Sequence, residues 1–342
     1  MFALQAALEQ GRFRGPLART CAAAWACIAE RTVVRPLHLP QGTRVIAVGG
    51  ATLGGSGRTP LAIACATELA ACGARVAFVG HAYRAKPGRA RVVSVGDALH
   101  EVGDEALVAA HALALARVPV VVAPKRADAV ALAAREADTL VLDGVAQTSP
   151  VRATLALLAV DGVEPWGRAG SVAPCGDLRA PKAALLRACD AVVPIRDGAA
   201  GVDSAPERAL GAWDCTTASS GARVGGALHT WDDLCRLRLG LLCAMARPER
   251  VVRSLEGRGV VLRAVVRARD HGPLSPGVLA RAALAGREQR IDLWLATRKC
   301  LLHFARASVD VGNVLQAPLG AIEHALVLSM GLGQRLRFLA VP

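Results

Sequence analysis

Residues 52–59 read Thr-Leu-Gly-Gly-Ser-Gly-Arg-Thr, and this glycine-rich turn constrains the fold more than any other segment of the chain. A short apolar run, Arg44–Val48, precedes the turn, and an alanine-rich helical stretch, Pro60–Cys72, follows it. Glycines between a strand and a helix let backbone N–H groups converge on phosphate oxygens at the helix amino terminus. The segment therefore predicts a phosphate-binding loop, with a ligand-free tight turn as the alternative.

The loop departs from the GxxxxGK[ST] motif at two positions. Thr52 stands for the first glycine and Arg58 for the lysine, while Thr59 supplies the final hydroxyl that can ligate magnesium. Arginine keeps the charge but is a larger, planar donor, so we expect a reshaped phosphate cradle. The predicted nucleotide-binding residues are Thr52, Gly54, Gly55, Ser56, Gly57, Arg58 and Thr59.

Short apolar runs and alanine-rich stretches continue to alternate beyond the loop. Further strands are expected at residues 75–80, 118–123, 139–142, 155–160 and 191–195, and helices at 103–116, 126–135 and 180–188. This alternation predicts an α/β fold with a doubly wound, mostly parallel sheet over residues 41–200.

The length of 342 residues exceeds that of a usual single domain. Residues 201–226 lie in a stretch with few long apolar runs and are expected to be a linker. Residues 227–342 then predict a smaller α/β domain, with helices at 248–257 and 276–285, strands at 260–266 and 292–296, and a terminal helix at 321–338.

The amino-terminal region, residues 1–40, contains a mostly apolar stretch, Leu17–Ala29, flanked by arginines. The stretch is too short to cross a bilayer core, which needs about 20 residues. Trp25 and the flanking charges suit a helix at a membrane surface, and an ordinary amphipathic helix packed on the domain fits equally well.

The charge and the aromatic content of the chain limit the classes of partner that it can bind. The formal charge of +13 indicates an anionic partner, but aromatic residues make up only 3% of the chain, which disfavours stacking on single-stranded nucleic acid. We therefore expect no nucleic-acid partner. The ten cysteines include no CxxC pair, which argues against structural zinc and fits a reducing cytosol.

Several charged residues could carry chemistry. Asp143 follows an apolar strand, where a carboxylate can help hold magnesium, although an aspartate there is common in α/β folds. Asp104 and Glu105 open a helix, where they could act as general base or metal ligand, or only complement the helix dipole.

Two further sets of charged residues could take part in catalysis or binding. Asp270 and His271 form a carboxylate–imidazole pair suited to accepting a proton. Arg84 belongs to a basic loop that either binds phosphate or is simply solvated. The remaining histidines lack ligand spacing and are interpreted as structural.

Taken in order, several segments resemble the tetraacyldisaccharide 4'-kinase family of the lipid A pathway. Residues 44–60 are similar to its strand and GGTGKTP loop, and residues 103–105 match its GDE. Residues 174–181, 246–250 and 270–271 resemble its PAGPLREP, ARPERF and DHH stretches. Members of this family phosphorylate a membrane-embedded disaccharide lipid with ATP, so the resemblance implies that activity.

The resemblance also implies roles for individual residues. Asp104 would act as base with His271, beside Asp270, and ATP would lie along the glycine loop. Thr59, Glu105 and Asp143 would hold Mg²⁺, and Arg84, Arg126 and Arg179 would contact the lipid A disaccharide precursor. The amino-terminal helix would dock at the cytoplasmic face of the inner membrane.

The chain departs from the family pattern near the site. Besides Arg58, the DDGxQH stretch reads Asp143-Gly144-Val145-Ala146-Gln147-Thr148, SRGY reads Gly80-His81-Ala82-Tyr83, and TEKD reads Thr297-Arg298-Lys299-Cys300. Each change loses a polar or charged group. The alternatives to an active kinase are a relative that binds nucleotide or lipid without turnover, and a phosphate-loop enzyme acting on a small metabolite.

Overall fold

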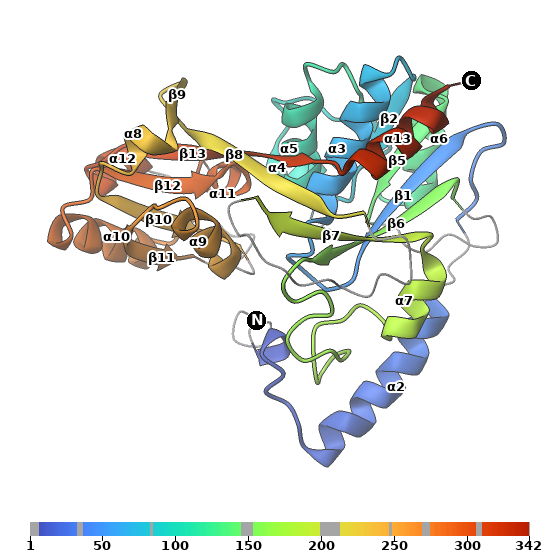
Figure 1. Ribbon diagram of the computed structural model, residues 1–342, viewed down its shortest axis with the longest axis horizontal. Helices are drawn as coiled ribbons and strands as arrows, with labels where there is room; N and C mark the ends of the chain where they lie inside the picture. The colour runs from blue at the N-terminus through green and yellow to red at the C-terminus, as the bar shows by residue number, and fades with distance from the viewer. Residues whose placement is uncertain are drawn as a thin grey trace.

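The computed structural model describes residues 7–32, 37–82, 85–144, 153–198, 213–245, 248–268, 274–305 and 310–341. Its strands form one sheet in the order β11-β10-β12-β13-β8-β7-β6-β1-β5-β2-β4-β3, with β9 paired to β8 (Figure 1). The strands are β1 (Arg44–Gly50), β2 (Val76–Val79), β3 (Arg91–Val92), β4 (Val120–Val122), β5 (Thr139–Asp143), β6 (Leu155–Asp161), β7 (Ala191–Asp197), β8 (Cys215–Val224), β9 (Ala227–Thr230), β10 (Leu239–Cys243), β11 (Leu262–Arg267), β12 (Leu293–Thr297) and β13 (Leu319–Val327).

Helices cover both faces of this sheet. They are α2 (Pro16–Thr32), α3 (Arg58–Ala71), α4 (Leu99–Val102), α5 (Asp104–Leu113), α6 (Arg126–Glu136), α7 (Lys182–Ala188), α8 (Trp231–Leu234), α9 (Pro248–Glu256), α10 (Pro276–Glu288), α11 (Arg298–Phe304), α12 (Val311–Leu315) and α13 (Met330–Ala340).

The first lobe, β1 to β7, is doubly wound as predicted. Strands β7, β6, β1, β5, β2 and β4 are parallel, and β3 adds an antiparallel edge. Alternate residues of β1 point to opposite faces, so Ile46 packs in the core beneath α3 and α5, and Val45 packs in the core beneath α6. Because both faces are covered, the strands can be apolar throughout. Parallel pairing also gathers the strand ends after β1 and β5 at one edge.

The second lobe extends the same sheet, as Figure 1 shows for the strands from β8 to β13. The parallel strands β11, β10, β12 and β13 contribute to a separate hydrophobic core, in which Trp294 is fully buried. The strands and helices predicted between residues 248 and 296 are confirmed as α9, β11, α10 and β12.

Residues 215–224 were expected in the linker but form β8. This strand pairs in parallel with β7 and antiparallel with β13, so it joins the two lobes through backbone hydrogen bonds. Its small residues give little apolar signal, because backbone pairing rather than a large buried side chain holds them. Residues 201–212 of the expected linker lie outside the described residues.

The helix expected over residues 321–338 is wrong in its first half. Residues up to Val327 belong to β13, which pairs with both β12 and β8, and a helix, α13, begins only at Met330. Ser329 caps α13 by accepting a hydrogen bond from the Leu332 N–H. The pairing of β13 with its two neighbouring strands therefore overrides the helical pattern of the sequence. Helix α13 then packs against the first lobe and contributes to the core that contains α3.

Helix α2 confirms the predicted amino-terminal helix and shows how it packs. Ala22, Ala26 and Ala29 form a stripe at helical spacing that contacts the core near α7. Leu17, Trp25 and Ile28 instead point outward, at 78%, 46% and 49% exposure. Among the described residues, no helix is both long and apolar enough to cross a membrane.

Candidate phosphate-loop active site

The glycine-rich segment forms the predicted turn between β1 and α3. Gly55 and Gly57 adopt left-handed φ values of 72° and 77°, which side chains disfavour. A Cβ on Gly57 would lie 2.5 Å from Ile195 Cδ1, so a side chain there would also force Ile195 to move. The buried Thr52 hydroxyl donates to the Gly54 carbonyl at 2.7 Å. Thr52 thus braces the turn at the position where the motif has its first glycine.

Segments remote in sequence hold this loop. The Leu53 N–H donates to the Asp177 carbonyl at 2.8 Å, and Arg179 Nε donates to the Thr52 carbonyl at 3.0 Å. From α9 of the second lobe, Arg250 donates to the Gly55 carbonyl and pairs with Asp161 at 3.0 Å. The residues that resemble PAGPLREP and ARPERF therefore support the glycine loop itself.

A cavity of about 1600 Å³ opens along the loop and between the two lobes. Its walls include Gly54–Thr59, Glu105 and Arg179 from the first lobe, and Arg250, Arg298 and Lys299 from the second. The cavity is large enough for a nucleotide with part of a second substrate.

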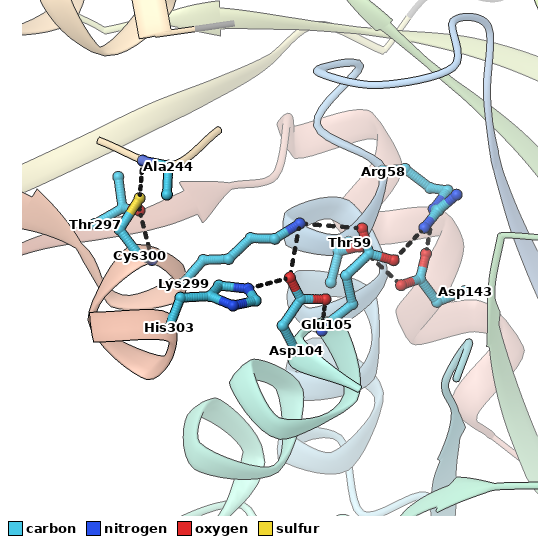
Figure 2. A network of polar contacts seen from close by, with 10 residues as sticks. All are labelled: Arg58, Thr59, Asp104, Glu105, Asp143, Ala244, Thr297, Lys299, Cys300 and His303. Carbon is cyan, nitrogen blue, oxygen red and sulfur yellow. Dashed lines mark hydrogen bonds and ion pairs between the residues drawn. The ribbon is translucent and has the colours of Figure 1, made fainter. Parts of the chain in front are cut away.

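Arg58 does not extend along the loop but turns toward two carboxylates (Figure 2). Its Nε donates to Asp143 Oδ1 at 2.7 Å, and its Nη2 donates to Glu105 Oε2 at 2.6 Å. Burial by itself lowers the pKa of Arg58, but the two carboxylates outweigh it, so the pKa ends above its ordinary value. The guanidinium therefore remains charged and bridges both acids.

The three predicted magnesium ligands lie together. Thr59 Oγ1 donates to Asp143 Oδ2 at 2.8 Å, and Arg58 connects Asp143 with Glu105. A hydroxyl and two carboxylates are the oxygen donors that Mg²⁺ prefers, so the residues fit the ion in donor type. Within the described ranges, no group of three or more His, Cys, Asp or Glu side chains is arranged so that it could hold a metal ion.

Gly144 and Arg126 lie next to Arg58 and Asp143. Gly144 has a left-handed φ of 85°, and a Cβ there would lie 3.4 Å from Arg58 Cζ and from Arg126 Nη2. Arg126 Nη1 donates to the Asp143 carbonyl at 2.8 Å, and burial lowers the pKa of Arg126 to about 10. Arg126 does not line the cavity. In this structure its hydrogen bond instead orients the backbone carbonyl of Asp143.

Asp104 occupies a second, more enclosed centre, also drawn in Figure 2. Its Oδ2 lies 2.9 Å from His303 Nε2, and its Oδ1 accepts from the Glu105 N–H at 2.8 Å. Both side chains of the Asp104–His303 pair are almost fully buried. Lys299 Nζ lies 3.5 Å from Asp104 Oδ2 and 3.5 Å from Glu105 Oε1. The second lobe thus places an imidazole and an ammonium on the predicted base.

Sequence reasoning missed His303 and Lys299 as site residues. They lie four residues apart at helical spacing, which places them on one face of α11. That spacing and the comparison of residues 297–300 with TEKD were the available signals. Asp104 is 199 residues away from His303, so only the fold reveals that pair. Asp270, His271 and Arg84 lie outside the described residues, and their roles stay predictions.

A glycine-rich loop between β1 and α3, with a carboxylate at the end of the neighbouring strand β5, defines an α/β protein of the phosphate-loop class. Residues 16–321 match the family model described as tetraacyldisaccharide-1-P 4'-kinase. The chain belongs to the tetraacyldisaccharide 4'-kinase family.

Individual relatives agree with this assignment. The tetraacyldisaccharide 4'-kinase of Methylobacterium radiotolerans is 34% identical over 89% of this chain and 88% of the relative. That of Bradyrhizobium diazoefficiens is 34% identical over 80% of this chain and 78% of the relative. The crystal structure of LpxK from Aquifex aeolicus in complex with ATP has a TM-score of 0.68 at 17% identity, covering 94% of this chain and 99% of that one. The last comparison confirms the fold.

Proposed function

We propose that this protein transfers the γ-phosphate of ATP to the 4'-hydroxyl of tetraacyldisaccharide 1-phosphate in lipid A biosynthesis. The observation that carries the proposal is the Asp104 centre. A carboxylate at the start of α5 is held by residues of α11, beside the glycine loop and the cavity between the lobes. Phosphoryl transfer needs positioning and charge neutralisation more than covalent chemistry, and this arrangement provides both.

The loop N–H groups and the amino terminus of α3 suit the ATP phosphates. Thr59, Asp143 and Glu105 would hold magnesium, which when bound neutralises phosphate charge. Arg179 lies on the cavity wall and is proposed to contact an anionic group of a substrate, although its Nε also supports the loop. Arg126 acts through Asp143, because its guanidinium donates to the Asp143 carbonyl.

Asp104 is proposed as the proton acceptor for the attacking hydroxyl. Asp104 itself is buried, whereas Lys299 and Glu105 line the cavity. A hydroxyl therefore reaches Asp104 Oδ2 once the Lys299 ammonium moves aside. His303 is a positioning residue, since its Nε2 holds the Asp104 carboxylate in one orientation at the start of α5. The resemblance adds His271, beside Asp270, as a further partner of this base, and Arg84 as a substrate contact.

Helix α2 is proposed to bring the enzyme to its lipid substrate. The outward side chains Leu17, Trp25 and Ile28, with the exposed Arg12 and Arg14 before them, suit the interface of an anionic membrane. We place this surface on the cytoplasmic face of the inner membrane. In this arrangement residues 1–40 dock, residues 41–200 bind nucleotide, and residues 227–342 complete the site.

Transfer of labelled γ-phosphate to purified tetraacyl disaccharide 1-phosphate in detergent micelles tests the proposal. We expect a bisphosphorylated lipid that forms with added magnesium and disappears with a chelator. Absence of product, with ATP binding retained in calorimetry, would instead identify a relative without turnover. Label on a small hydroxylated metabolite but not on lipid would favour the third alternative.

A further inference from the structure

We propose that Arg58 is a built-in cation of this site. In the nucleotide-free protein its guanidinium occupies the space between Asp143 and Glu105 that a divalent cation would otherwise take, and Gly144 makes room for it. Metal binding is then weak until ATP is present. This inference rests on the proposed function, because that function assigns Asp143 and Glu105 to magnesium.

The contacts of Arg58 are the first argument. One guanidinium donates to carboxylates from two different elements, β5 and α5, at 2.7 and 2.6 Å. The side chains of Arg58 and Asp143 are only 12% and 1% exposed, so water screens this interaction weakly. A metal ion binding to both carboxylates must first displace a close, charge-assisted contact at each of them.

Charge balance is the second argument. The cluster contains three carboxylates, Asp104, Glu105 and Asp143, and they contact the cations Lys299 and Arg58. Arg126 adds a third positive charge at the Asp143 carbonyl. Among the described residues of this cluster, three cations therefore match three carboxylates, and a divalent ion would add two positive charges. ATP carries the negative charge that removes this excess.

The environment of Gly144 is the third argument. A Cβ at this position would lie 3.4 Å from Arg58 Cζ and Nη1, already in van der Waals contact with the guanidinium. A larger side chain at Gly144 would therefore press on the guanidinium in the position where it bridges the acids. The arginine at position 58 and the glycine at position 144 are two departures from the family pattern that fit each other.

The consequence is a link between nucleotide and metal. When ATP phosphates enter the loop, they offer Arg58 a new anionic partner a short distance away. The guanidinium can then leave the carboxylates to the metal that accompanies the nucleotide. By thermodynamic linkage, metal should strengthen ATP binding by the same factor as ATP strengthens metal binding.

Binding of Mn²⁺, a paramagnetic probe for the magnesium position, tests the inference on the full chain without nucleotide. Electron paramagnetic resonance of free Mn²⁺ should show binding at least about tenfold tighter in Arg58→Met than in the wild type, because the competing cation is gone. Arg58→Lys, which is less prone to disturb folding, should shift affinity in the same direction by a smaller factor. Equal affinity in the wild type and both variants would overturn the proposal.

Arg238→Met is the matched control, since Arg238 also donates twice to a carboxylate, that of Asp292, on the exposed surface of the second lobe. It should leave Mn²⁺ affinity unchanged, and a shift equal to that of Arg58→Met would likewise overturn the proposal. Failure of the kinase function is recorded separately. It appears as absent lipid phosphorylation by the wild type, whatever the Mn²⁺ affinities are.

Discussion

Two carboxylate centres lie side by side at the start of α5, and they are built differently. Asp104 is enclosed by His303 and Lys299, which come from the second lobe. Glu105 faces the cavity and shares Arg58 with Asp143 within the first lobe, and Lys299 is its contact from the second lobe. Adjacent acids in the sequence therefore have different environments in the fold.

The difference indicates a division of labour. A buried carboxylate fixed by an imidazole from another lobe is suited to hold one orientation and accept a proton. A partly open carboxylate pair bridged by an arginine is suited to exchange one cation for another. Removing a residue of the first centre should impair transfer, whereas changes in the second should alter how metal and nucleotide bind.

Loss of the Asp104 carboxylate should have the largest effect. Asp104→Asn is expected to lower kcat by about 10² to 10⁴-fold, the range for a general base, because the amide cannot accept the proton. ATP affinity in calorimetry should stay within about threefold, since Asp104 does not line the cavity. A kcat close to that of the wild type would remove Asp104 from the role of base.

Changing its partner should have a smaller effect on the rate. His303→Ala leaves a buried carboxylate without its imidazole, so we expect about 1 to 3 kcal/mol lower stability in urea unfolding and a kcat reduced about 10 to 100-fold. His303→Gln can still donate to Asp104 Oδ2 and should recover most of both losses. If Gln and Ala behave alike, the hydrogen bond has no role in orienting Asp104.

Replacing the bridge of the second centre should act in the opposite direction. Arg58→Lys should raise turnover about two- to tenfold at limiting magnesium, because lysine is a single point charge that cannot bridge two carboxylates in the same way. Initial rates across a magnesium series would measure this. An unchanged or lower rate throughout the series would show that the site is adapted to arginine.

The exposed pair Arg238–Asp292 shows how much an ion pair outside both centres contributes to stability. Hydrogen bonds from Arg238 lower the pKa of Asp292 to about 2, below the value near 3.9 of an unfolded chain. The pair therefore stabilises the fold above pH about 4, and this contribution is lost as pH falls toward about 2. Asp292→Asn should flatten that part of a Tm–pH curve slightly, without changing turnover. A curve of unchanged slope would mean that the pair does not form in solution.

Much of the first lobe could be predicted from local sequence. The glycine loop, α5 and β5 each carry a short-range pattern, and Asp143 and Thr59 meet because parallel strand ends share one edge. The strand β13 could not be predicted in this way, since pairing with two other strands overrides its helical pattern.

The site itself was only half predictable. Thr59, Glu105 and Asp143 were expected at one site, and in the structure Arg58 and direct contacts connect them. Asp104 directly precedes Glu105 at the start of α5. The partners of Asp104 were not predicted. Lys299 and His303 contact Asp104 only because the fold places α11 of the second lobe beside the start of α5. A short-range sequence pattern contains no information on such a long-range contact.

The most direct test is a double-mutant cycle in single-turnover phosphoryl transfer, with Asp104→Asn, His303→Ala and the two combined. If His303 acts through Asp104, the combined variant should transfer phosphate at the rate of Asp104→Asn alone, within about threefold. If instead the losses of the single variants multiply in the combined one, the two residues act independently, and the lobe-spanning centre proposed for the base is contradicted.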